Sequence, residues 1–168
     1  QLAQFRLLSN QFGEDYIIRT YFDPKKIEYH NPAYMSFFSS FWTKYIPTKL
    51  SQSMQLRLDS VINIEKSYQT LSALLSEDTL LDNPIMRELV ILRNIPQLYK
   101  MEDFNKKAII NILYDISASK YSKENQQIAI NIRKRLENLR SGKQAPDFEL
   151  FDHNSDTLTL ERLAGKYI

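Results

Sequence analysis

The sequence predicts a mainly α-helical chain with a short β-hairpin near its C-terminal end. Only 3 glycines and 6 prolines occur among its 168 residues, too few for the many turns of an all-β fold. Apolar residues recur three or four positions apart through residues 1–141, as they do in amphipathic helices. From Gly142 onward the spacing changes to the alternation of a strand. We therefore expect a helical domain at 1–141 and a distinct segment at 142–168.

Two segments open the helical domain. Residues 1–12 carry apolar side chains at helical spacing, and Gly13 would end this helix. Residues 16–22 are rich in aromatic and β-branched residues, which suit a strand, but no partner strand is apparent nearby. We favour a helix for this segment as well.

The segment 31–47 has clear helix boundaries. Asn31 is a good N-cap and Pro32 fits the first helical position, while Pro47 is expected to end the helix. Aromatic side chains mark one broad face of this helix, namely Tyr34, Phe37, Phe38, Phe41, Trp42 and Tyr45.

A second helix uses the same boundary residues. Asn83 is its predicted N-cap, Pro84 its first residue and Pro96 its expected end. Its apolar residues nearly encircle the helix, so we expect it to be central and buried. These residues are Ile85, Met86, Leu89, Val90, Ile91 and Leu92.

The remaining helical segments are predicted at 52–63, at 67–75 with Ser67 as cap, and at about 103–117. A last helix begins at Ser122 and ends at Gly142, with an apolar stripe of Ile128, Ile132, Leu136 and Leu139. Together the segments predict a bundle of about six short antiparallel helices around one core.

The segment after Gly142 predicts a β-hairpin. Phe148 and Leu150 alternate with polar residues as in a short strand, and the polar run 153–156 favours a turn. Residues 157–159 can form the returning strand, and residues 160–165 fit one helical turn.

Composition excludes several kinds of function for this chain. The formal net charge is +2 with interspersed signs, which gives little electrostatic reason to expect nucleic acid or an anionic membrane as a partner. There is no cysteine, hence no disulfide or thiol chemistry, and no apolar run is long enough to span a membrane. His30 and His153 lack the spacing of metal ligands, and there is no glycine-rich phosphate loop. We predict no catalytic residue, cofactor or metal site in this chain.

The aromatic face of residues 34–45 has two interpretations. Aromatic side chains at helical spacing usually belong to a core, and we favour that interpretation. They also line clefts, so our candidates for contact with a partner are Tyr29, Tyr34, Trp42 and Tyr45. Among these we expect the three tyrosines to lie nearest the surface, because their hydroxyls need partners or water.

A motif in residues 142–166 resembles the beginning of a known domain family. Its residues are Gly142, Ala145, Pro146, Asp147, Phe148, Leu150, Gly165 and Lys166. In chain order they form the pattern G-x-x-A-P-D-F-x-L, followed by a polar hairpin, by leucines and by G-K. This pattern resembles the entry segment of the thioredoxin-like redoxin superfamily, which contains TlpA-type thiol-disulfide oxidoreductases and peroxiredoxin-like AhpC/TSA domains. Three helical stretches, residues 29–38, 80–92 and 128–142, precede this motif, and the last leads directly into it. Through these stretches the helical region resembles the accessory region that precedes such domains in Bacteroidetes-type envelope proteins.

The resemblance implies that residues 142–168 are the first part of a truncated thioredoxin-like α/β domain. It further implies an exported protein of the periplasm or cell envelope, whose reactive cysteines follow residue 168 and whose substrates are disulfide-bearing proteins. The helical domain would then be non-catalytic and would position partners or mediate homodimerisation. Two alternatives stay open: an independent helical protein-binding scaffold, and the accessory region of a peroxiredoxin-like peroxidase.

We predict that residues 1–141 fold cooperatively. Residues 147–168, without the rest of their sheet, are expected to be loosely held or to pair with a neighbouring molecule through an open strand edge. Amide hydrogen exchange measured by NMR should be fast over 147–168 and slow in the helices. Equal protection in both parts would show that the C-terminal segment belongs to the helical domain.

Overall fold

A computed structural model describes residues 16, 20–22, 27–138, 148–151 and 153–164 of the protein. Within these residues the protein is mainly helical with one small two-stranded antiparallel sheet, as the sequence predicts. The chain divides into two compact units, Gln1–Arg133 and Lys134–Ile168. The predicted helix at 1–12 lies outside the described residues, while Tyr16, Thr20 and Tyr21 are helical, in agreement with the preference for a helix there.

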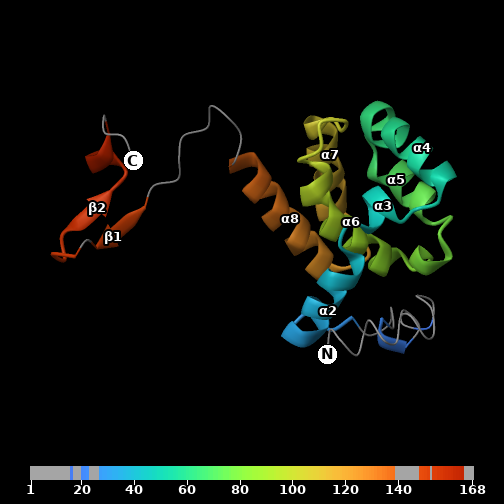
Figure 1. The fold of residues 1–168 in the computed structure, drawn as a ribbon, viewed down its shortest axis with the longest axis horizontal. Coiled ribbons are helices and arrows are strands. Elements are labelled where there is room, and N and C mark those ends of the chain that lie inside the picture. The colour runs from blue at the N-terminus through green and yellow to red at the C-terminus, as the bar shows by residue number, and fades with distance from the viewer. Residues whose placement is uncertain (1–15, 17–19, 23–26, 139–147, 152, 165–168) are drawn as a thin grey trace. The chain divides into compact units, whose positions relative to one another are not determined.

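Helices follow one another through residues 32–138 with short connections (Figure 1). The α-helices are α2 (Pro32–Trp42), α3 (Tyr45–Thr48), α4 (Gln52–Ser60), α5 (Tyr68–Leu75), α6 (Pro84–Leu98), α7 (Lys106–Ser117) and α8 (Lys123–Asn138). A π-helical turn, η1 (Val61–Glu65), continues α4, and a 3-10 turn, η2 (Thr79–Leu81), precedes α6.

Asparagine side chains begin α2 and α6 at the positions that the sequence predicts. The Oδ1 of Asn31 accepts from the backbone N–H groups of Ala33 and Tyr34, at 3.0 and 3.2 Å. Asn83 caps α6 in the same way, and Pro84 follows it as the first helical residue. Such caps satisfy N–H groups that have no partner inside the helix.

The start of α7 differs from the prediction at Asp103. Asn105 is the cap, since its Oδ1 accepts from the N–H groups of Lys107 and Ala108. The carbonyl of Asp103 instead accepts from Asn63 Nδ2 at 2.8 Å, and the N–H of Asn105 donates to Asn63 Oδ1 at 2.7 Å. The side chain of Asn63 in η1 therefore fixes the loop in which α7 begins.

The predictions that Pro47 and Pro96 end helices are wrong. Helix α2 ends at Trp42, where Lys44 takes a left-handed conformation with φ 59°, and Pro47 lies in the first turn of α3. A proline is tolerated there because its missing N–H would have no partner in the helix.

Pro96 lies inside the last turn of α6, which continues to Leu98. The N–H of Tyr99 bonds to the carbonyl of Ile95 at 2.9 Å, so helical hydrogen bonding resumes after the proline. Ile95 and Leu98 are both buried. Burial of this turn outweighs the local cost of the proline.

Helix α6 is the centre of the helical unit, as its encircling apolar residues predict. It packs against α2, α3, α5 and α7 (Figure 1). Its buried apolar residues are Met86, Leu89, Val90, Ile91, Leu92, Ile95 and Leu98. Burying a single side chain of this kind contributes roughly 1.5–3 kcal/mol, so this helix supplies much of the hydrophobic stabilisation.

The aromatic face of α2 belongs to the core, which confirms the favoured interpretation. Phe38, Phe41 and Trp42 are buried in α2. Phe22, which is also buried, stacks on Phe37 with ring centroids 5.0 Å apart and meets the ring of Phe38 edge to face. The segment before α2 is therefore attached to it by ring packing.

Polar side chains of α6 hold the end of α2. Asn94 is fully buried, and its Nδ2 donates to the carbonyls of Trp42 and Val90 at 3.0 and 2.8 Å. Arg93 donates from Nε to the carbonyl of Ser39 at 3.2 Å and from a terminal nitrogen to the hydroxyl of Thr43. A cation beside the last carbonyls of a helix also complements the helix dipole.

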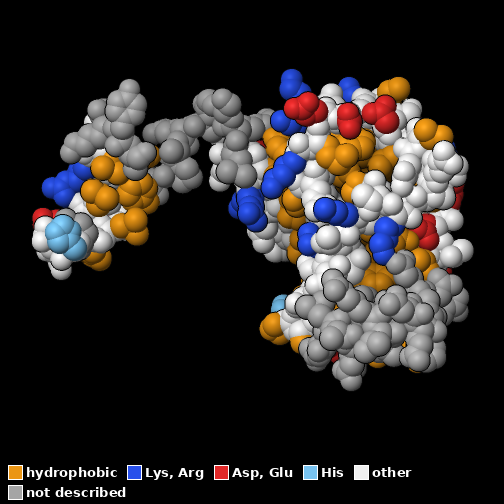
Figure 2. Space-filling view, viewed as in Figure 1, with side chains coloured by type: hydrophobic (Ala, Val, Ile, Leu, Met, Phe, Trp, Pro, Cys, Tyr) orange, Lys and Arg blue, Asp and Glu red, His pale blue; other side chains and the backbone are white. Residues whose placement is uncertain are grey.

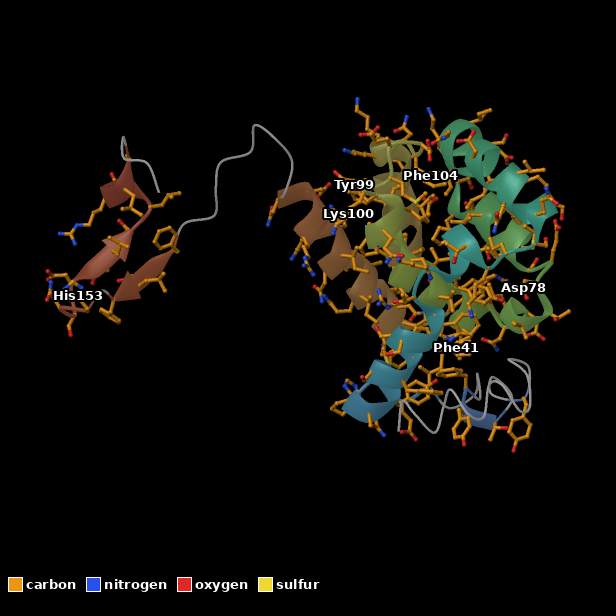
Figure 3. All side chains as sticks on the ribbon, viewed as in Figure 1. Phe41, Asp78, Tyr99, Lys100, Phe104 and His153 are labelled. Carbon is orange, nitrogen blue, oxygen red and sulfur yellow. The ribbon has the colours of Figure 1, made fainter. Side chains whose placement is uncertain are left out.

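The second unit contains the predicted hairpin. Strands β1 (Glu149–Phe151) and β2 (Thr157–Thr159) pair antiparallel with Leu150 opposite Leu158, and the 3-10 turn η3 (Glu161–Leu163) follows. His153 lies at the turn (Figure 3). Hydrophobic side chains gather on this hairpin (Figure 2), where Leu150 is 59% and Phe151 76% exposed.

Replacing Asn94 by alanine should lower the free energy of unfolding by about 1–3 kcal/mol, because the buried carbonyl of Trp42 loses its donor. Urea unfolding followed by circular dichroism measures the change. Asn131→Ala is the matched control: Asn131 is an exposed residue within α8, so this change should stay within about 0.5 kcal/mol. Equal effects of the two substitutions would contradict the assignment.

Candidate functional site

A pocket of about 320 Å³ opens on the helical unit where the loop before α2 meets the start of α8. Its lining consists of Ile27, Tyr29, Ile85, Tyr121, Ser122, Lys123 and Glu124. The pocket thus combines aliphatic side chains, two tyrosines, a hydroxyl and charges of both signs.

The first turn of α8 shapes one side of the pocket. Ser122 is the predicted cap, and its Oγ accepts from the N–H of Asn125 at 3.2 Å. The same hydroxyl donates to Glu124 Oε2 at 2.9 Å. Hydrogen bonds from the backbone N–H of Glu124 itself and from Ser122 lower the pKa of the Glu124 carboxyl, with smaller contributions from His30 and Lys123. The Glu124 side chain is therefore a carboxylate at neutral pH.

A chain of buried polar groups leads from the pocket to α6. The hydroxyl of Tyr29 donates to Asn125 Oδ1 at 2.9 Å. The Nδ2 of Asn125 in turn donates to Glu88 Oε2 at 3.1 Å and to the carbonyl of Ile85 at 3.0 Å. Asn125 and Glu88 are fully buried, and Glu88 Oε1 makes no hydrogen bond with any described residue. These contacts fix the start of α8 against α6.

The phenol groups of Tyr29 and Tyr68 lie near acidic side chains that affect their pKa. Burial raises the pKa of Tyr29, the hydrogen bond with Ser122 opposes that shift, and the charges of Glu124 and Glu88 add to it. Burial likewise raises the pKa of Tyr68, and the charge of Glu88 raises it further. A phenol near carboxylates resists ionisation because a second negative charge would be repelled.

Two of the candidate contact residues, Tyr29 and Tyr34, are partly exposed. Tyr29 lines the pocket, whereas the hydroxyl oxygen of Tyr34 on α2 is buried. Their role as contacts stays a prediction.

Trp42 and Tyr45 have almost no surface, with exposed fractions of 0% and 3%. The expectation that Tyr45 lies near the surface is wrong, because its hydroxyl finds a partner within the fold. It donates to Asp78 Oδ2 at 2.8 Å, and its ring packs edge to face on Trp42 with centroids 4.6 Å apart. Both side chains belong to the core rather than to a contact surface.

Most residues of the redoxin-like motif lie outside the described part of the chain, namely Gly142, Ala145, Pro146, Asp147, Gly165 and Lys166. Phe148 is partly exposed just before β1, and Leu150 lies within that strand. The resemblance therefore stays a prediction.

The sequence did not predict the buried polar residues Glu88 and Asn125, which join α6 to the start of α8 beside the pocket. Glu88 is a charged residue on a helix whose apolar residues nearly encircle it, which is a signal for a buried polar contact. The burial of Asn125 is harder to predict from sequence, because the predicted apolar stripe of this helix runs through Ile128 and Ile132. Those isoleucines are only partly buried, whereas Asn125 and Ala129 are fully buried.

Within the described ranges, no group of three or more His, Cys, Asp or Glu side chains is placed to hold a metal ion. None of the helices in the part of the chain that the structure describes has the length and hydrophobicity of a membrane span.

Comparisons with protein-family models, with curated proteins and with solved structures find no match to this chain.

Replacing Tyr29 by phenylalanine should destabilise the protein by about 1–3 kcal/mol, because the buried Oδ1 of Asn125 loses its donor while the ring is kept. Thermal and urea unfolding measure this. Tyr121→Phe removes a hydroxyl from a ring that is 51% exposed and should change stability by less than about 0.5 kcal/mol. A neutral Tyr29→Phe substitution would show that the hydroxyl does not fasten α8.

Proposed function

We propose that the helical unit is a non-catalytic accessory region of an exported thiol-disulfide oxidoreductase with a thioredoxin-like domain. In this proposal it positions disulfide-bearing partner proteins, or mediates dimerisation, for a cysteine-based site that follows residue 168. The protein would act in the periplasm or cell envelope, where disulfides form and persist.

The observation that carries the proposal is the hairpin of the second unit. The redoxin entry motif implies a short strand, a polar turn, a returning strand and a leucine-containing helical turn. Strand β1, the turn at 153–156, strand β2 and η3 follow one another in that order. A two-stranded hairpin is marginally stable alone and gains stability when further strands or a helix cover it. The exposed Leu150 and Phe151 fit a hairpin that lies against more of a domain.

The chemistry follows from the same resemblance. A cysteine thiolate with a lowered pKa attacks a substrate disulfide, and a second cysteine resolves the mixed disulfide. The printed sequence has no cysteine, so its own residues supply no thiol to this reaction. The helical unit would contribute binding and orientation.

A second candidate is an independent protein-binding scaffold. It is supported by two large aliphatic side chains exposed on the continuous helix of α4 and η1, Leu56 and Ile64. Exposed apolar groups of this size on a helical surface suit contact with another protein.

Reading the coding sequence beyond residue 168 tests the proposal. We expect Cys-x-x-Cys after the next strand, and the full-length protein should then reduce the disulfides of insulin in the presence of dithiothreitol. A serine replacement of the first cysteine should abolish that activity. A single cysteine would favour the peroxidase, and the absence of any cysteine would exclude both redox functions and leave the scaffold.

A further inference from the structure

The pocket between the loop at Ile27 and Tyr29 and the start of α8 opens at the N-terminus of a helix. Helix N-termini ordinarily attract anions, because their N–H groups are unpaired and the helix dipole is positive there. At the N-terminus of α8 the acidic side chain of Glu124 already takes the place of such an anion. The hydroxyl of Ser122 donates to the carboxylate of Glu124 at 2.9 Å, and the backbone N–H of Glu124 helps to lower the pKa of this carboxyl. A second anion would be repelled, whereas a cation would be attracted.

The walls of the pocket are suited to a cation. Tyr29 and Tyr121 line it, and Tyr121 is half exposed. The face of an aromatic ring attracts ammonium and guanidinium groups within about 6 Å. The same protein uses this interaction elsewhere: the guanidinium of Arg133 lies 4.1 Å from the ring centre of Tyr114, and Lys106 Nζ lies 5.7 Å from that of Tyr99.

Glu124 of α8 is the acidic side chain among the lining residues, whereas Glu88 of α6 does not line the pocket and is hydrogen-bonded to Asn125. Both side chains help to raise the pKa of Tyr29, after the larger effect of burial. Ile27 and Ile85 add an aliphatic surface, which suits the methylene stem of a long basic side chain.

Lys123 is the basic side chain in the lining, and it is exposed. Its own ammonium group therefore competes with a bound cation for Glu124. His30 is a second basic group that contributes to the lowered pKa of Glu124. Removing the charge of Lys123 should strengthen binding, while removing that of Glu124 should weaken it.

We infer that this pocket binds the side chain of a lysine or arginine of a partner polypeptide, with the cation beside Glu124 and the tyrosines and the stem against the isoleucines. The partner would present a basic side chain on an exposed segment. The inference concerns contacts of the helical unit alone, so it holds or fails independently of the cysteine motif expected after residue 168.

The test is an NMR titration of the 168-residue chain with N-acetyl-lysine-N-methylamide, N-acetyl-arginine-N-methylamide and the uncharged N-acetyl-norleucine-N-methylamide. We expect saturable amide shifts at residues 27–30, 85 and 121–125 with the lysine or arginine probe, and none with norleucine. The stronger of the two basic probes identifies the preferred side chain.

Variants sharpen the test. Glu124→Gln should weaken binding of the basic probe about two- to fivefold, as expected for an exposed ion pair, and Lys123→Gln should strengthen it. Glu65→Gln changes an exposed acid in η1 that does not line the pocket and should have no effect. Absent or non-saturable shifts, equal binding of norleucine, or unchanged affinity in Glu124→Gln would each overturn the inference.

Discussion

The packing of the helical unit depends on the hydrogen bonds that side chains of α6 donate to the C-terminal end of α2. The carbonyls of a helix C-terminus have no partners in their own helix, and burying them without donors is costly. At the end of α2 the carbonyl of Trp42 accepts a hydrogen bond from the buried side-chain amide of Asn94. The carbonyl of Ser39 accepts one from Arg93. Only with these donors in place does the aromatic face of α2 pack into the core at low cost. The left-handed Lys44 then turns the chain into α3, which also packs on α6.

Other polar side chains of α6 hold further segments in the same way. Arg87 donates to Ser72 Oγ at 2.9 Å and to the carbonyls of Leu81 and Asp82 at 2.6 and 3.1 Å, which fastens η2 to α5 and α6. Glu88 accepts from Asn125 and so fixes the start of α8. A buried charged or amide side chain is tolerated only where it is bonded, so each of these residues specifies the position of a neighbour. The candidate pocket follows from this arrangement, because Asn125 places the first turn of α8 beside Tyr29.

Local features of the fold could be predicted from sequence, since they depend on neighbouring residues. Asn31 with Pro32 and Asn83 with Pro84 begin helices at the predicted positions, and the hairpin lies where its alternation and turn residues place it. Features that depend on distant residues could not be predicted. Pro96 does not end α6 because the buried Ile95 and Leu98 hold the last turn, and Tyr45 is buried because Asp78, 33 positions away, accepts its hydroxyl. The pocket is lined by residues near positions 29, 85 and 122, and no local sequence pattern predicts that these three segments lie together.

The protein's one tryptophan makes the central claim measurable, because Trp42 lies fully buried at the junction of α2 and α6. If α6 makes the helices one cooperative unit, Trp42 fluorescence and far-ultraviolet circular dichroism should give superimposable urea unfolding curves. The native emission should also resist quenching by acrylamide. A fluorescence transition at lower urea than the loss of helical signal would show that α2 leaves α6 while the other helices stay folded, and would contradict this account.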